Sequence, residues 1–296
     1  IDGYMIGKKV FILGSGDIGL IMARRMSLEG AEVLGVAELM PYSNGLPRNM
    51  KQCLDDFGIP LYLSHTVTNI YGRDRLECIE LTKVDDKRQP IKGSEMYFDV
   101  DTLLLSVGLI PENTLAEEAG IEMDHSIRGP VVDENYMTSV PGIFACGNGL
   151  HVHDLADFVT KQAGEAAVGA ARYYESLKGQ LTETKNRNQI TADSTTSEYE
   201  DVALADNSYC EVHAGNLVGY VVPAKLHKEN LPKAVTFYFR VRRPMNDITI
   251  EILKGDKLLR SIYKDVVIPS EMEQVAIAGK HLEETDGDLT IQIKEN

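Results

Sequence analysis

The alternation of apolar and polar residues predicts a parallel α/β unit near the start of the chain. Between Lys9 and Glu38, an apolar run, a glycine-rich turn, a helical pattern that ends at Leu28 and a second apolar run follow one another. Strands that are apolar at nearly every position are typical of parallel sheets, which are covered on both faces. This order of elements predicts a right-handed βαβ unit.

Further elements of the same kind follow. A helix is expected over 49–57, where a glycine ends it, and a parallel strand over 59–63. Two strands, 75–84 and 95–98, flank a polar stretch and predict an antiparallel hairpin. A final buried strand is predicted over 101–107.

Beyond residue 110 the elements become shorter and more mixed. The pattern predicts a helix over 112–119, short strands around Val131 and Ile143, and a long helix over 156–177. Residues 179–200 are rich in Thr, Ser, Asn and Lys and have little apolar periodicity, which is typical of a linker.

The last part of the chain alternates with a period of two. Apolar and polar side chains take turns over 235–241 and again over 248–252, and 254–256 has the residues of a turn. Several such segments predict an all-β, sandwich-like domain. The predicted fold class is therefore α/β followed by a small all-β C-terminal domain. The predicted boundaries are 1–110, 111–178, a linker over 179–200, and 201–296.

Composition and charge narrow the function classes. The chain has 296 residues, with 30 Lys and Arg against 45 Asp and Glu, which gives a net charge of −15. Such an acidic chain is poorly suited to bind nucleic acid through its phosphates. The longest apolar stretch, 102–110, is shorter than the roughly 20 residues of a membrane-spanning helix. Four cysteines without a close pair favour a reducing, cytoplasmic location.

The glycine-rich turn carries the clearest chemical signal. It closes an apolar strand, opens a helix, and has an acidic residue, Glu38, at the end of the next strand. In this context GxGxxG indicates a dinucleotide site, with the pyrophosphate at the helix N-terminus and Glu38 on the ribose hydroxyls. The Glu38 charge would repel a 2′-phosphate, so NAD is favoured over NADP. The plain alternative is a tight turn without a ligand. The predicted binding residues here are Gly14, Ser15, Gly16, Asp17, Ile18, Gly19 and Glu38.

Three segments together resemble a known family. They are the turn at 14–19, a strand-glycine-Pro-Asn segment at 102–113, and Thr-Ser-Val-Pro-Gly-Ile-Phe-Ala-Cys-Gly-Asn at 138–148. Over residues 8–178 the chain resembles the two-dinucleotide flavoprotein oxidoreductases related to the pyridine nucleotide-disulfide reductases. The resemblance implies a Rossmann-like NAD-binding domain over 1–110 and the second part of an FAD domain over 111–178. It also implies that Gly108, Gly147 and Asn148 contact cofactor.

The chain departs from this family's pattern in four ways. Asn148 stands where the family usually has Asp, and Asp17 and Ile21 stand where an aromatic residue and Glu often lie near the nicotinamide. No CxxC or CxxxxC pair is present. The family's first GxGxxG, which binds the ADP half of FAD, would precede Ile1. We therefore expect a fragment that holds no stoichiometric FAD by itself, although its full-length parent does.

A cluster of polar residues after the flavin-like segment has two interpretations. Imidazole and carboxylate groups can bind zinc or act as acid and base. The favoured interpretation is a flavin-facing loop in which Asp154 caps the following helix. The residues are His151, His153, Asp154 and Asp157.

Other polar positions have plain interpretations. Cys146 is expected to be a small core residue. Arg240, Arg242 and Arg243 are expected on a solvated face, with a carboxylate partner or a subunit contact as the alternative.

The resulting functional hypothesis is a flavin-dependent oxidoreductase that transfers hydride between NAD(H) and FAD in the full-length parent. The cofactors carry this chemistry, so no catalytic side chain and no metal ligand is predicted. The alternative is a non-catalytic dinucleotide-binding or assembly module whose β domain docks a partner. Expected partners are a nicotinamide dinucleotide, an oxidoreductase subunit and further copies of the chain, without nucleic acid or a membrane span.

Overall fold

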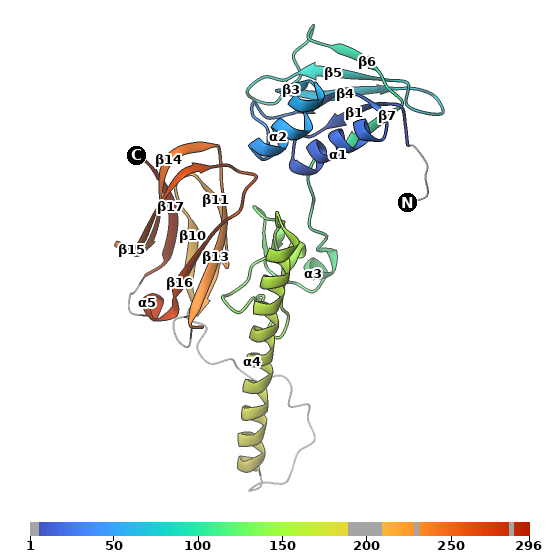
Figure 1. Ribbon diagram of the computed structural model, residues 1–296. Helices are drawn as coiled ribbons and strands as arrows, with labels where there is room; N and C mark the ends of the chain where they lie inside the picture. Colours follow the sequence, from blue (N-terminus) through green and yellow to red (C-terminus); the bar gives the residue numbers. More distant parts are fainter. Residues whose placement is uncertain (1–5, 189–208, 228–230, 284–286) are drawn as a thin grey trace. The chain divides into compact units, whose positions relative to one another are not determined.

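The computed structural model describes residues 6–188, 209–227, 231–283 and 287–296. The chain forms two compact units, 1–109 and 110–296 (Figure 1). The predicted α/β and all-β segments 111–178 and 201–296 therefore belong to one unit.

The first unit contains a four-stranded parallel sheet with the order β3-β2-β1-β7. Its strands are β1 (Lys9–Leu13), β2 (Glu32–Glu38), β3 (Leu61–Leu63) and β7 (Thr102–Leu105). The first strand lies between β2 and β7 and is parallel to both. This order is that of a mononucleotide-binding half of the Rossmann fold, and it confirms the predicted βαβ unit.

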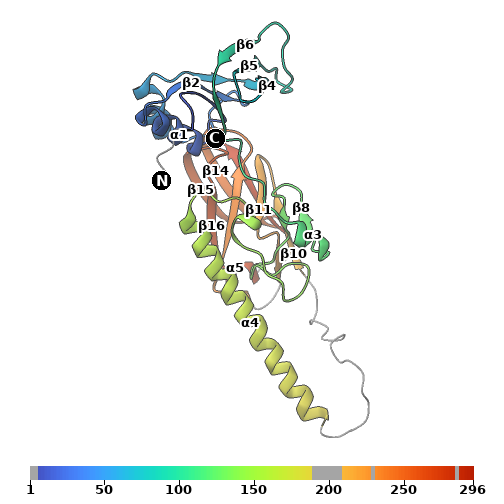
Figure 2. The same cartoon turned by 90° about the vertical axis from the view of Figure 1, so that its right-hand side faces the viewer.

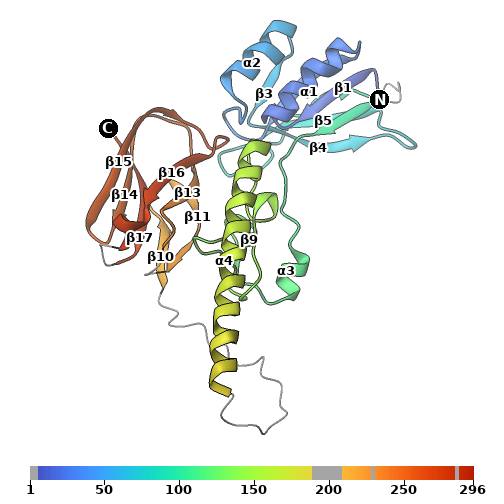
Figure 3. The same ribbon diagram turned by 60° about the horizontal axis from the view of Figure 1, so that its bottom comes forward.

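Both faces of this sheet are covered, as its uniformly apolar strands require. Val10 and Ile12 pack under the helices, whereas Phe11 packs under the antiparallel strands. Figure 3 shows the helices on one side of β1 and β3, and β4 and β5 on the other. The covering elements are α1 (Asp17–Leu28), α2 (Pro47–Cys53), the short helix η1 (Asp55–Phe57), β4 (His65–Tyr71), β5 (Cys78–Lys83) and β6 (Met96–Asp99). The predicted hairpin is the antiparallel pair of β5 and β6.

The prediction of a fully buried strand over 101–107 is wrong. Thr102 is buried, but Leu105 is 67% exposed and Val107 is 66% exposed. In the described part of the chain β7 has a strand neighbour on one side only, β1, so its far end lacks cover. An apolar run indicates a strand but not its position in the sheet.

The second unit begins with irregular chain and short elements before α4 (Ala156–Asn188). The predicted strands near Val131 and Ile143 are reduced to isolated bridges, Val132 with Thr138 and Met137 with Phe144. The other elements here are α3 (Thr114–Glu118), β8 (Met123–Asp124), β9 (Gly129–Pro130) and the short helix η2 (Gly147–Gly149).

The long helix α4 runs farther than predicted. We expected a helix over 156–177 and a linker over 179–200, but α4 continues through Asn188 (Figure 2). Helical hydrogen bonding does not need an apolar stripe, which is why the periodicity ended before the helix did. Residues 189–200 lie outside the described part of the chain.

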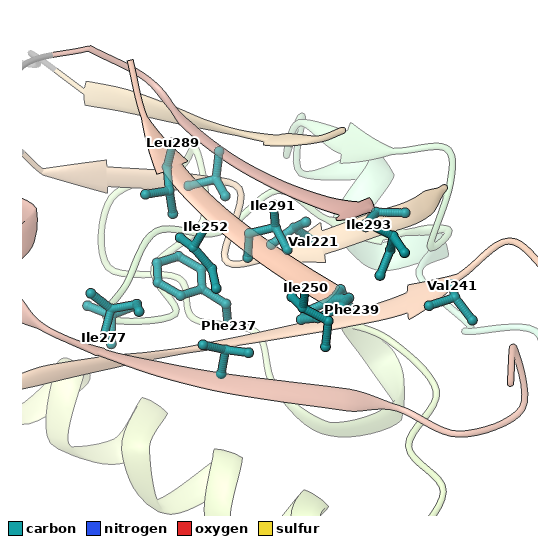
Figure 4. Close-up of a cluster of buried hydrophobic side chains, with 14 of the residues drawn as sticks. Val221, Phe237, Phe239, Val241, Ile250, Ile252, Ile277, Leu289, Ile291 and Ile293 are labelled. Carbon is teal, nitrogen blue, oxygen red and sulfur yellow. The ribbon is translucent and has the colours of Figure 1, made fainter. Parts of the chain in front are cut away.

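The end of the chain forms a two-layer β-sandwich, as predicted. One sheet has the order β12-β10-β17-β14-β15 and the other β11-β13-β16. Phe237, Phe239, Ile250 and Ile252 point into the shared core (Figure 4). The elements are β10 (Tyr209–Ala214), β11 (Val218–Val222), β12 (Lys225–His227), β13 (Ala234–Val241), β14 (Met245–Lys254), β15 (Lys257–Val267), β16 (Glu273–Ala278), α5 (Gly279–Glu283) and β17 (Leu289–Glu295).

The alternation in β13 has one exception. Tyr238, which the period-two pattern directs away from the core, is completely buried because His151 and His153 pack against its ring. The outer face of β13 is therefore covered by the segment before α4. No helix in the described ranges is long and apolar enough to cross a membrane.

Candidate functional site

Two glycines of the turn are required by packing. Gly14 has φ = +106°, and a Cβ there would lie 2.0 Å from the Ser106 carbonyl oxygen. A Cβ on Gly19 would lie 2.3 Å from the carbonyl oxygen of Gly14 and 3.0 Å from the Ser106 side chain. The turn and the first residues of α1 therefore pack closely against the chain that follows β7.

Gly16 differs from its neighbours because nothing in the protein requires it. A Cβ at this position would meet no atom within 4 Å. Its backbone angles, φ = −65° and ψ = 164°, suit any residue. Gly16 is the N-cap of α1, and no side chain caps this helix. The turn thus leaves open space at a helix N-terminus, where backbone N–H groups and the helix dipole favour an anion.

Glu38 is tied to the turn from the end of β2. Its Oε2 accepts hydrogen bonds from the Ser15 amide (3.0 Å) and the Ser15 hydroxyl (2.7 Å), and its Oε1 accepts one from the Met40 amide (3.0 Å). Glu38 as a whole residue is only 5% exposed. Since each oxygen can accept about two hydrogen bonds, Oε1 can accept one more. The Ser15 side chain is buried and acts by orienting Glu38.

A loop after β2 also contacts the turn, and the sequence analysis missed it. Ser43 donates to the Ser15 carbonyl (3.1 Å), and the Asn44 amide donates to the Ser15 hydroxyl (3.2 Å). Oδ1 of Asp17 accepts from the Leu46 amide (2.9 Å) and from Asn49 (2.7 Å). The polar Ser-Asn-Gly run that follows Glu38 so closely was the available signal.

Exposed apolar groups flank the turn. Ile18 and Ile21 on α1 are exposed, as are Leu105 and Val107 at the end of β7. Gly108 follows with φ = +94°, and a Cβ on it would meet no atom within 4 Å. Apolar side chains and open glycine positions therefore surround the carboxyl ends of the parallel strands, where α/β sheets bind ligands.

The flavin-like segment is held by a buried glutamine of α4. The Gly147 amide donates to Oε1 of Gln162 (2.7 Å), and Gln162 is completely buried. Asn148 is exposed, and its Oδ1 accepts from the His153 amide (3.0 Å). An aspartate could accept the same bond, so Asn148 keeps the loop contact and leaves its amide NH₂ free of any partner in the described ranges.

Gln162 also fixes the protons of the two histidines. His153 Nε2 lies 2.9 Å from Gln162 Oε1, and His151 Nε2 lies 2.8 Å from Gln162 Nε2. Because Oε1 accepts from Gly147, His153 must donate from Nε2 and His151 must accept at Nε2. The proton of His151 is therefore on Nδ1. Burial lowers the pKa of His151 to about 3 and also lowers the pKa of His153, so both rings are neutral.

This arrangement disfavours the zinc interpretation of the cluster. In the described ranges, no three of His151, His153, Asp154 and Asp157 bring ligand atoms within 4.8 Å of one another. Zinc on Nδ1 of His151 would also require a proton on Nε2, where Gln162 donates.

The expectations that Asp154 caps the helix and that Arg240 is solvated are wrong, whereas Arg242 and Arg243 are exposed, as expected. Asp154 accepts hydrogen bonds from Arg240 and from the Met272 amide (2.7 Å), so it links the loop to the sandwich. Arg240 also donates to the carbonyls of Val152 and Pro269. Arg242 donates to a carbonyl as well, and Arg243 pairs with Glu295. A sequence cannot show partners this far away. Cys146 packs beside a small buried cluster, in agreement with its predicted core role.

Comparison with known proteins places these features in a family. The sequence model described as pyridine nucleotide-disulphide oxidoreductase matches residues 3–171, more than half of the chain. An NADH oxidase of Methanocaldococcus jannaschii is 31% identical over 172 residues, which cover 55% of this chain and 34% of that protein. The mitochondrial dihydrolipoyl dehydrogenase of Caenorhabditis elegans is 29% identical over 149 residues, covering 48% of this chain and 29% of that protein.

The chain thus spans about a third of the length of these relatives. A crystal structure of T. acidophilum thioredoxin reductase aligns with a TM-score of 0.48 and 28% identity, covering 57% of this chain and 53% of that one. On the family match, this chain belongs to the pyridine nucleotide-disulphide oxidoreductase family.

Proposed function

We propose that the turn at 14–19 binds NAD(H), and that the full-length protein transfers hydride between NAD(H) and FAD. The observation that carries this proposal is Gly16. Packing explains Gly14 and Gly19, but a Cβ on Gly16 would meet no protein atom within 4 Å. A pyrophosphate that approaches the backbone supplies the missing reason for a glycine there.

Glu38 supports NAD(H) over NADP(H). Its carboxylate has one acceptor position left at Oε1, which suits a ribose hydroxyl. A 2′-phosphate at the same place would meet a negative charge that Ser15 and Met40 hold in position. The preference for NAD(H) over NADP(H) therefore comes from the fixed Glu38 carboxylate rather than from the size of the site.

The apolar surface beside the turn suits the nicotinamide end. A ring lying past the carboxyl ends of β1 and β7 would contact Ile18, Leu105 and Val107, which are exposed in this chain. These side chains would exclude water from the ring. When bound, FAD would supply the hydride acceptor or donor, and the protein would position and insulate the two rings.

The flavin side of the proposal rests on Gly147 and Asn148. Gln162 holds the Gly147 amide, and the free amide NH₂ of Asn148 could donate to an oxygen of the cofactor. An oxidoreductase partner subunit, association of copies and a cytoplasmic location remain part of the proposal. Four free cysteines accord with a reducing compartment.

Calorimetric titration with NADH and NADPH tests the nucleotide assignment. The wild-type chain should bind NADH at least about tenfold more tightly than NADPH. Glu38→Gln should narrow that ratio, whereas Glu32→Gln, at the exposed start of the same strand, should leave it unchanged. A wild-type chain that binds both nucleotides equally would remove Glu38 from the ribose site. In the full-length protein, bleaching of the flavin absorbance by NADH would separate an oxidoreductase from a non-catalytic module.

A further inference from the structure

A second cluster of chemically active side chains lies away from the dinucleotide turn, within the second unit. Asp133 and Glu134 follow β9, and His227 is the last residue of β12. The His227 amide donates to Oε2 of Glu134 (2.9 Å), which joins positions 93 residues apart. We propose that Asp133, Glu134 and His227 bind one divalent transition-metal ion such as Zn²⁺ or Mn²⁺.

The geometry is close to that of a metal centre. Nδ1 of His227 lies 2.8 Å from Oε1 of Glu134 and 3.8 Å from Oδ2 of Asp133. All three ligand atoms lie within 4.8 Å of one another. Ligand atoms bound to one ion at about 2.0–2.2 Å are separated by roughly 3–3.5 Å, so small side-chain movements suffice.

The charge of the cluster calls for a cation. Asp133 is 3% exposed and Glu134 is 7% exposed. Buried carboxylates are normally paired with cations or coordinate metals. In the described ranges, no Lys or Arg lies within 4.0 Å of either carboxylate, and Lys225, which lines the same cavity as Asp133, pairs with Glu122. Two carboxylates therefore face one imidazole, and a divalent ion would balance them.

One carboxylate oxygen is directed at the centre without a hydrogen bond. Oδ1 of Asp133 accepts from the amides of Asn135 (2.8 Å) and Met137 (3.0 Å). Oδ2 of Asp133 accepts none in the described part of the chain, although the residue is almost fully buried. The backbone thus holds one oxygen and leaves the other for a ligand beside His227.

The surroundings provide orientation and space. The Tyr209 ring packs on the His227 ring with centroids 4.7 Å apart, and Asn135 donates to Oε1 of Glu134 (2.7 Å). Such outer contacts orient metal ligands. A cavity of about 160 Å³ adjoins one of the three proposed ligands, Asp133, and is also lined by Tyr209 and Lys225. Since a water occupies about 30 Å³ of liquid, the cavity has room for waters beside Asp133.

The donor set selects the class of metal. One imidazole nitrogen with two carboxylate oxygens suits Zn²⁺ or Mn²⁺, whereas Ca²⁺ and Mg²⁺ prefer oxygen alone. This proposal does not depend on dinucleotide binding, because none of its residues belongs to the turn at 14–19.

The test uses the whole chain after removal of metals with a chelator. Calorimetry with Zn²⁺ and electron paramagnetic resonance with Mn²⁺ should show one saturable site per chain, which excess Mg²⁺ does not displace. Glu134→Gln and His227→Gln should weaken binding by at least about tenfold. A matched control is available in His213, which lies 3.8 Å from Glu211 and 3.4 Å from Asp288 but is half-exposed. His213→Gln should bind metal like the wild type.

If His227→Gln fails to fold, Asp133→Asn provides a second test of metal binding at this cluster. Its carbonyl oxygen can still accept from Asn135 and Met137, but its NH₂ group would face the ion, so metal binding should be lost with the fold intact. Absence of a saturable site in the wild type would overturn the proposal. Loss of binding in His213→Gln, or retention in Asp133→Asn, would also overturn it.

Discussion

At the scale of single residues, the three glycines of the turn serve different needs. Gly14 and Gly19 allow the chain to pack against Ser106 and against itself, so they would be needed without any ligand. Gly16 faces open space at the start of α1. The three glycines of the motif therefore separate into two positions that packing requires and one, Gly16, that packing does not require.

Gly19→Ala should destabilise the chain without any reference to nucleotide. Its Cβ would lie 2.3 Å from a backbone oxygen that cannot move independently, so the free energy of unfolding should fall by about 2–3 kcal/mol. Gly164→Ala is the control, because this glycine of α4 has no atom within 4 Å of an added Cβ. There the change should stabilise by about 0.5–1 kcal/mol. Urea unfolding measures both, and an unaffected Gly19→Ala would contradict the packing described.

His151 should make the fold sensitive to acid. Burial lowers its pKa in the folded chain to about 3, from the ordinary value of 6.5. As the pH falls below 6.5, His151 takes up a proton in the unfolded chain before it does so in the folded chain. The free energy of unfolding should therefore fall by up to about 1.4 kcal/mol per pH unit. The stability that neutral His151 contributes is complete above the pKa of the unfolded chain and is lost as the pH falls below that pKa.

Urea unfolding at about pH 7.5 and about pH 5.5 tests this sign. His151→Gln, whose side-chain oxygen can still accept from Gln162, should lose about 1 kcal/mol less than the wild type between the two conditions. The raised pKa of His227 acts in the opposite direction but is common to both proteins. If the wild type and His151→Gln lost the same free energy of unfolding between the two pH values, His151 would take up its proton in the folded chain, and the prediction would be wrong.

At the scale of elements, β13 and α4 together hold the flavin-like loop. Gln162 of α4 binds Gly147 and both histidines, and Arg240 of β13 binds Asp154 and the Val152 carbonyl. The loop is thus fixed from two elements that flank it in space. The β-sandwich has a structural role beside the flavin-like segment.

Arg240→Met should therefore lower the free energy of unfolding much more than Arg243→Met does. The Arg240 side chain is 18% exposed, and its loss leaves Oδ1 of Asp154 and two carbonyls without this donor, which should lower the free energy of unfolding by about 2–4 kcal/mol. Arg243 is 51% exposed in its pair with Glu295, and its removal should cost less than about 1 kcal/mol. Similar losses in both variants would contradict the anchoring role of Arg240.

The elements that the sequence predicts well are those with local causes. The strand, turn and helix from Lys9 to Leu28 follow from apolar runs and glycine spacing, and period two predicts the sandwich strands. Partners distant in sequence were not predictable. Arg240 and Asp154 are 86 positions apart, and no local pattern links them. The end of α4 at Asn188 was missed because its last turns are polar, and the exposure of Leu105 depends on the order of strands in the sheet.

At the scale of the whole molecule, the chain combines a family segment with a β-sandwich that the family match does not reach. The match ends at residue 171, inside α4, whereas the second unit continues to Asn296. The chain contains one GxGxxG turn, which we assign to NAD(H). Flavin would then be held only through the region of Gly147 and Asn148, without pyrophosphate contacts from a second glycine turn.

We therefore expect the chain purified as given to contain much less than one FAD per molecule. Absorbance of flavin released by heat measures this content. One FAD per chain would contradict the assignment of 14–19 to NAD(H) alone and the expectation that tight flavin binding needs a second glycine turn.

Gly16→Ser tests most directly the claim that the turn at 14–19 binds NAD(H), because it should reduce NADH affinity without reducing stability. Serine is at least as good an N-cap as glycine and has free space here, so the free energy of unfolding should stay within a few tenths of a kcal/mol or rise. The added side chain would occupy the space that a pyrophosphate needs, so calorimetry should show NADH affinity reduced by at least about tenfold. An unchanged NADH affinity in a normally folded Gly16→Ser chain would contradict dinucleotide binding at this turn.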